Sequence, residues 1–228
     1  MEESTVRQIN HATRTVASTL GILVGLAGID HGIFEILQGN APTNDIMIAA
    51  IGSAQRFWEY GEETALTIVP SFLLTGILAV FFGILVTVWS IAFIERRYGS
   101  AVFLLLGGIL FLVGGGFAPI FTTAIASLVT TGINRPLKFW RMILPGFLRR
   151  FLSKIWLATL IIFVALFFVS VEIAIFGWPI TVFYDAVTTF DILNKLSFIM
   201  LGFMLLAPIT GFAHDIQVQV ERETDHHG

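Results

Sequence analysis

Long apolar runs constrain the fold of this chain more than any other feature of its sequence. The segments 73–93 and 155–175 are almost free of charged residues, and each has the roughly 20-residue length that a helix needs to cross a hydrocarbon core about 30 Å thick. A backbone in lipid must satisfy its own hydrogen bonds, so each run is predicted to be helical. The composition agrees, because only 13% of the residues are charged and 56% are hydrophobic, against about a quarter charged in soluble domains. The sequence predicts an all-α integral membrane protein with one polytopic domain over residues 1–228.

We expect about six transmembrane passes in this domain. Their predicted ranges are 16–37, 68–93, 101–116, 118–133, 155–175 and 196–213. No small-residue cleavage site follows the first run, so we interpret it as a retained helix. The polar stretch between the first two passes contains a segment, 46–60, whose mixture of apolar and aromatic residues predicts an amphipathic interfacial helix.

The segment 101–133 allows two interpretations. It is too long for one ordinary span, and the helix breakers Gly114-Gly115-Gly116-Phe117-Ala118-Pro119 lie in its middle. It is either one long tilted helix or a broken hairpin of two short helices. The positive-inside rule favours the hairpin, because two crossings put the basic segment 134–154 on the same side as Arg96 and Arg97.

This basic segment contains six cationic side chains and no acidic one. They are Arg135, Lys138, Arg141, Arg149, Arg150 and Lys154. Aromatic residues alternate with them and Pro145-Gly146 divides them, so we expect two amphipathic pieces that bind anionic lipids at the cytoplasmic surface. The same charge rule predicts a multi-pass protein of the cytoplasmic (inner) cell membrane with both termini in the cytoplasm. A nucleic-acid partner is excluded for want of a soluble basic domain.

Ionisable side chains inside predicted spans indicate a functional site, because a charge in the hydrocarbon core costs free energy. His31 and Glu35 are four residues apart and share a helix face. At 1.5 Å per residue from the inner end of their spans, these residues, Glu172 and the glycine break all reach the outer part of the membrane. We therefore predict a substrate- or ion-binding site in the outer half of the membrane. Its candidate residues are Asp30, His31, Glu35, Glu62, Glu172, Gly115 and Gly116.

Structural roles explain several of these residues equally well. Glu35, Glu62 and Glu63 fit the headgroup region at the ends of spans. Asp30 and His31 also fit a role in holding helices together, and glycines most often allow close helix packing. Glu172 is flanked by apolar residues and is the hardest to explain in this way.

Cofactor chemistry has little support in the sequence. The chain has no cysteine, which excludes disulfides and thiolate metal sites. His31, Glu35 and Glu172 offer ligands that suit Zn, Fe or Mn, but no HExxH motif accompanies them. We expect no resident cofactor, with a divalent metal at these three residues as the alternative.

Four stretches of the chain resemble a group of small prokaryotic polytopic membrane proteins without an established activity. The stretches are residues 28–40 (GIDHGIFEILQGN), 67–76 (TIVPSFLLTG), 114–119 (GGGFAP) and 133–137 (INRPL). The resemblance covers the first two-thirds of the chain and implies a membrane location.

The favoured function is a small transporter or channel-like protein, not an enzyme, for a cation, a proton-coupled solute or a lipid-like molecule. One alternative is a membrane-embedded enzyme whose His/carboxylate site acts on a lipid or quinone. Another is a non-catalytic accessory or scaffold subunit. In each case we expect a homo-oligomer or a partner membrane subunit within the lipid bilayer.

Overall fold

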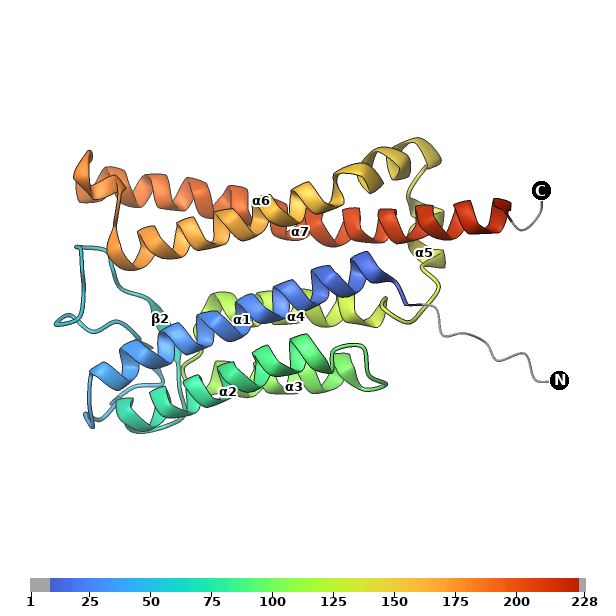
Figure 1. Ribbon diagram of the computed structural model, residues 1–228. Coiled ribbons are helices and arrows are strands. Elements are labelled where there is room, and N and C mark those ends of the chain that lie inside the picture. The colour runs from blue at the N-terminus through green and yellow to red at the C-terminus, as the bar shows by residue number, and fades with distance from the viewer. Residues whose placement is uncertain (1–8, 226–228) are drawn as a thin grey trace.

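The computed structural model describes residues 9–225, and this part of the chain is mainly helical (Figure 1). The helices are α1 (His11–Leu37), α2 (Phe72–Ala92), α3 (Gly99–Leu112), α4 (Phe117–Thr131), α5 (Lys138–Ile143), α6 (Gly146–Phe176) and α7 (Ala186–Asp225), with a 3₁₀ turn η1 (Ile180–Val182). Two short strands, β1 (Met47–Ala49) and β2 (Thr64–Leu66), form an antiparallel pair between α1 and α2 in which Ile48 faces Ala65. The predicted all-helical class is confirmed, with this small ribbon as an addition.

Four of the helices, α1, α2, α6 and α7, are long and apolar enough to cross a membrane. On α2 the side chains of Leu74, Ile77, Phe81, Ile84 and Val88 are all exposed. Their spacing of three and four residues makes a continuous apolar stripe along one helix face. Such a stripe is unfavourable in water and favourable in lipid. The chain is therefore a helical membrane protein.

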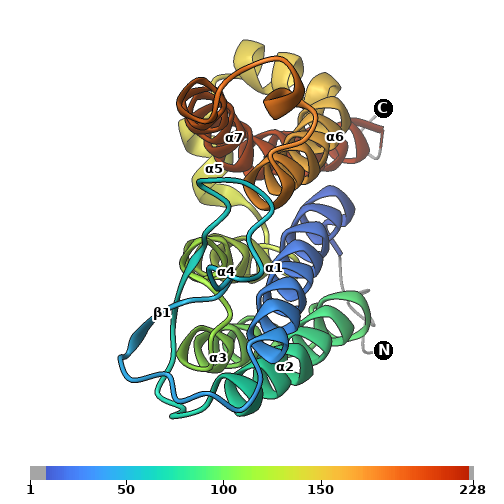
Figure 2. The same cartoon turned by 90° about the vertical axis from the view of Figure 1, so that its left-hand side faces the viewer.

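The helices lie in three layers (Figures 1 and 2). Helices α1 to α4 pack as a four-helix group in which each helix contacts the next along the chain and α4 contacts α1. Helices α6 and α7 pack mainly against each other, and α7 contacts α1. The largest buried cluster joins the two groups, since it contains Leu20 of α1 and Met204 of α7.

The chain forms two separate helices in the region 101–133, α3 and α4, which pack together. Between them, Gly114 and Gly116 have φ angles of 100° and 83°, which side chains other than glycine rarely adopt. The break is held by the neighbouring ribbon, because the Gly114 amide donates to the Leu66 carbonyl at 2.9 Å and the Ile68 amide donates to the Leu112 carbonyl at 3.0 Å.

The prediction of an interfacial helix over 46–60 is wrong, because this segment contains strand β1 and turns. Its backbone groups are used by partners outside the segment. The Ala50 amide donates to the Glu63 carbonyl at 2.7 Å, and the side-chain amide of Gln38 donates to the carbonyls of Ala49 and Ala50. These tertiary contacts outweigh the weak helix preference of the sequence.

Helices α6 and α7 are longer than the predicted spans. The first of the two amphipathic pieces is α5, but the second is not separate, because α6 begins at Gly146 and continues through it. Pro145 precedes this helix, at a position where its missing amide proton costs nothing. Helix α7 begins at Ala186, ten residues before the predicted span 196–213, and continues through Pro208 to Asp225.

The segment between α1 and α2 lies across one end of the helices (Figure 2). Its Trp58 indole donates to the Ala174 carbonyl on α6 at 2.9 Å, and the Tyr60 ring stacks on Phe190 of α7. This segment therefore joins the four-helix group to the α6–α7 pair at the end where β1 and β2 lie.

Candidate functional site

A cavity of about 450 Å³ lies between the two helix groups. Helices α1 and α4 contribute one side, α6 and α7 the other, and Glu63 from the segment between α1 and α2 contributes to one end. The volume is within the range of about 300–1,000 Å³ that small-molecule sites occupy. We call this space the interhelix cavity.

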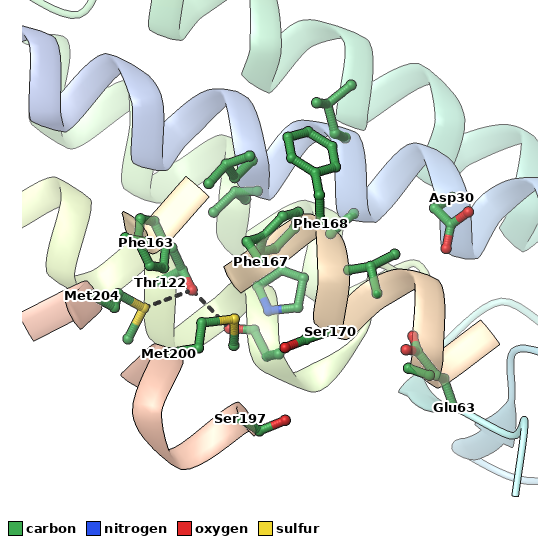
Figure 3. A pocket seen from close by; sticks show the side chains of 18 of the residues that line it. Asp30, Glu63, Thr122, Phe163, Phe167, Phe168, Ser170, Ser197, Met200 and Met204 are labelled. Carbon is green, nitrogen blue, oxygen red and sulfur yellow. Dashed lines mark hydrogen bonds between the residues drawn. The ribbon is translucent and has the colours of Figure 1, made fainter. Parts of the chain in front are cut away.

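The interhelix cavity has a polar end and an apolar body (Figure 3). Asp30 and Glu63 lie at the polar end, whereas Phe163 and Met204 lie toward the opposite end. His31 also lines the cavity and contacts Glu63. No lysine or arginine is among the described residues that line the cavity. The polar end is thus acidic, with a single imidazole beside two carboxyl groups.

His31 and Glu63 form the central contact of the polar end. The His31 Nε2 lies 2.6 Å from Glu63 Oε2, so the imidazole donates to the carboxylate. His31 is buried and Glu63 is half-buried. Burial raises the pKa of Glu63, but the hydrogen bond and the charge of His31 outweigh this effect and hold its pKa below the ordinary value. Glu63, on a segment outside the helices, therefore stays ionised against His31.

Backbone geometry fixes the His31 ring from its other side. A Cβ atom built on Gly116 would lie 2.6 Å from His31 Nε2 and 2.7 Å from its Cε1, so the imidazole rests directly on the backbone at the start of α4. Only glycine leaves this space, and the positive φ of the residue favours glycine as well. The predicted site residue Gly116 therefore shapes the site by its lack of a side chain.

The apolar body is built from adaptable side chains. Phe167 and Phe168 come from α6, and Met200 and Met204 come from α7. Methionine is unbranched and polarisable and fits irregular apolar ligands. Four hydroxyl or amide side chains, those of Thr122, Ser170, Asn194 and Ser197, interrupt this surface.

Glu35 lies one turn beyond His31 on α1 but does not line the cavity. Its side chain is 0% exposed, and neither carboxylate oxygen has a hydrogen-bond partner among the described residues. A Cβ atom on Gly114 would lie 2.5 Å from Glu35 Oε2, so the carboxyl group lies against the glycine break. Glu35 is thus a buried group in the protein interior and not a headgroup residue.

Two other predicted site residues lie outside the cavity. Glu62 is exposed and its Oε2 lies 3.5 Å from Arg56 Nη1, and Glu172 is exposed on α6. Gly115 packs against Leu110 and touches neither carboxyl group in its closest contacts. Glu172 is therefore available to lipid or to the membrane surface.

The described residues bring no group of three His, Asp or Glu side chains together in a way that suits a metal ion. In particular, His31 and Glu35 are buried in the four-helix group whereas Glu172 is exposed on α6. Glu172 is thus separated by its place in the fold from the other two residues named as a metal site.

Glu63 is the site residue that the sequence did not single out. It is next to Glu62 in the chain, immediately before strand β2, and successive residues of an extended segment point in opposite directions. The direction that faces the cavity depends on how the ribbon pairs. Its place beside Glu62, just before the second predicted span, was the sequence signal for it.

The basic residues predicted to bind lipid lie on α5, around it and along the first turns of α6. All are exposed except Arg149, which is half-buried, and Arg141 forms a bidentate pair with Glu223 of α7 at 3.0–3.1 Å. Exposed Phe139, Phe147 and Phe151 accompany them. Binding of anionic lipid at this surface stays a prediction.

Comparisons with known proteins add no assignment to this geometry. The resemblance of four sequence stretches to small prokaryotic membrane proteins stays a prediction. No protein-family model, no curated protein and no solved structure matches the chain.

Proposed function

We propose that this membrane protein is a transporter that binds an amphiphilic cation in the interhelix cavity. The cationic group lies against Asp30 and Glu63, and the apolar part lies among the side chains of α6 and α7. The observation that carries the proposal is the pairing of two carboxyl groups at one end of a long apolar cavity with no basic residue among its described lining residues.

Charge and desolvation both favour a cationic ligand. Asp30 and Glu63 line one end of the same cavity, and among its described lining residues His31 is the only one that can carry a positive charge. A negatively charged ligand group is repelled by these carboxylates, whereas a cation restores the interactions that they lose when they leave water. An anionic amphiphile with the same apolar part is therefore a poor ligand.

The location of the cavity supports transport over static binding. It lies between two helix groups that meet mainly through α1 and α7, so a movement of the α6–α7 pair relative to the four-helix group would change access to it. Many transporters hold their substrate between two such bodies near the middle of the membrane. The segment that carries Glu63 bridges the two groups at one end, where it would open and close the site.

We propose six membrane passes with both ends of the chain in the cytoplasm, α3 and α4 being two short passes. The chain has no cysteine, so single cysteines report sidedness directly. In intact bacterial cells, an impermeant maleimide is expected to label Glu59→Cys and to leave Arg97→Cys and Lys138→Cys unlabelled until the cells are opened. Labelling of Lys138→Cys from outside would mean that α3 and α4 together cross only once.

The ligand class is tested by photoaffinity labelling in lipid nanodiscs. The probe is a long-chain alkylamine with a diazirine at its apolar end. We expect saturable labelling of α7 near Met200 and Met204, competed by unlabelled alkylamine and not by an alkyl sulfonate of equal length. Glu63→Gln removes one full charge from the polar end and is expected to weaken binding about tenfold, or about 1.4 kcal/mol.

The adjacent acid provides the matched control for this test. Glu62→Gln changes the net charge of the protein by the same amount, but Glu62 lies outside the cavity beside Arg56. Its binding should equal that of the unchanged protein. Equal weakening by both variants, or labelling that the sulfonate competes as well as the amine, would refute the proposal. Vesicles containing the protein should accumulate the probe, and those with Glu63→Gln should not.

The His31–Glu63 pair also favours a second function, acid–base catalysis on an apolar substrate. A carboxylate oriented by an imidazole can act as a general base, and here the Glu63 carboxylate, held by His31, borders the cavity. The same labelling experiment separates the two functions, because an enzyme would release a chemically altered ligand, which mass spectrometry detects, and a transporter would return the ligand unchanged.

A further inference from the structure

Glu35 is the one buried ionisable group of α1 that the proposed ligand site does not use. Its side chain is fully buried, and both of its carboxylate oxygens are without a hydrogen-bond partner among the described residues. A bare charge in such a place is strongly unfavourable, whereas a neutral carboxylic acid is tolerated. The environment therefore suits a group that carries a proton and gives it up only when a nearby charge compensates.

The helices that surround Glu35 supply no permanent counter-ion. Helices α2, α3 and α4 all pack against α1, and their sequences contain no Asp, Glu, His, Lys or Arg. The ionisable residues nearest to Glu35 along its own helix are Asp30 and His31, and His31 in turn contacts Glu63 from the segment before β2. Of these only His31 can become positive.

His31 connects the buried group to the cavity. Its Nε2 donates to Glu63 at 2.6 Å, while its Nδ1 is buried and has no hydrogen-bond partner among the described residues. Residues four apart on a helix face the same side, so the imidazole and the Glu35 carboxyl group lie on the same face of α1. They form no direct hydrogen bond with each other, and a bridging water molecule is the connection that a proton would need. The Nε2 atom is thus bonded to a residue of the cavity, and the buried Nδ1 atom is free to bond to another group.

We propose that Glu35 is a proton-loading site that exchanges one proton with the interhelix cavity through His31 and Glu63. The Glu35 hydroxyl gives its proton to His31 Nδ1, which leaves a carboxylate beside an imidazolium. The imidazolium then passes its Nε2 proton to Glu63, and one proton has moved without any change of oxidation state. A cation bound against Asp30 and Glu63 competes for the same carboxylate, so ligand binding and proton occupancy are coupled, and the coupling is reciprocal.

This inference rests on the proposed function for the identity of the ligand, but the proton site has a test of its own. Infrared spectroscopy of the protein in nanodiscs is expected to show the carbonyl band of a protonated carboxylic acid at neutral pH. Glu35→Gln should remove that band, and Glu62→Gln, which changes an acid exposed beside Arg56, should leave it. A band that persists in Glu35→Gln would overturn the assignment.

Coupling is measured as proton release when the alkylamine probe binds, with a pH indicator in weakly buffered solution. We expect release of about one proton per bound probe by the unchanged protein, and loss of this release in Glu35→Gln while the probe still binds. Glu35→Gln is isosteric and neutral, so it should fold. Undiminished release in the variant would refute the proton site and leave the proposed function standing. A failure of the probe to bind would refute the proposed function, and the infrared band would still decide the protonation of Glu35.

Discussion

Replacing Asp215 with alanine is expected to lower the free energy of unfolding by about 3–5 kcal/mol. The side chain of Asp215, on α7, is 6% exposed and accepts hydrogen bonds at the start of α1. The amides of Ala12 and Thr13 donate to it at 3.1 and 2.7 Å, and the Thr13 hydroxyl donates at 2.7 Å. These amides have no partner within their own helix, and the helix dipole favours a negative charge there.

The measurement is unfolding of the purified protein in mild detergent, by heat or by graded denaturing detergent. Asp215→Asn keeps the shape but has one acceptor oxygen, so it should lose an intermediate amount of stability. Asp191, on the same helix, is exposed and bonded to Lys195 at 2.6 Å. Asp191→Ala should change stability by less than about 1 kcal/mol. If Asp215→Ala were as stable as Asp191→Ala, α7 would not hold the start of α1 in this way.

The second large effect is expected at the contact of α1 with α2. Gly32→Ala should destabilise the protein by about 3 kcal/mol, the upper end of the cost of overpacking. A Cβ on Gly32 would lie 2.6 Å from the Gly76 carbonyl oxygen and 2.8 Å from the Val80 amide nitrogen. These are backbone atoms, so the two helices would have to separate, and no side-chain rotation can relieve the contact.

The control substitution is expected to change the free energy of unfolding in the opposite direction. Gly108, on α3, has nothing within 4 Å of a built Cβ. Gly108→Ala removes backbone freedom from the unfolded chain without a clash and should stabilise the protein by about 0.5–1 kcal/mol. The two variants are compared in the same unfolding assay. Equal changes in stability at both positions would show that α1 and α2 are not in close backbone contact at Gly32.

The site was partly predictable from the sequence because its rarest residues are also its most informative. Charged side chains are costly inside an apolar helix, so Asp30 and His31 stood out in the first span, and both line the interhelix cavity. Glu35 stood out for the same reason, but its helix position alone did not distinguish a headgroup residue from one with no exposed surface.

The choice between neighbouring acids depended on the tertiary structure. Glu62 and Glu63 have the same chemistry and adjacent places in the chain, yet only Glu63 reaches His31. The antiparallel pairing of β1 with β2 determines which of them faces the cavity. Asp215 was also missed, because an acid just beyond the end of a predicted span is ordinary, and its partners are about two hundred positions earlier in the sequence.

By itself the sequence determined the membrane location, the helical class and the approximate places of the helices, since all three follow from the length and polarity of local segments. It also predicted the helix break at the glycines, because the low helix preference of glycine is a property of each residue's own backbone. Only the tertiary structure decided which acids meet, where the cavity lies, and that the segment 46–60 pairs and turns where a helix was expected. These features depend on contacts between residues far apart in the chain, whose free energies exceed the small local preferences that a sequence pattern reveals.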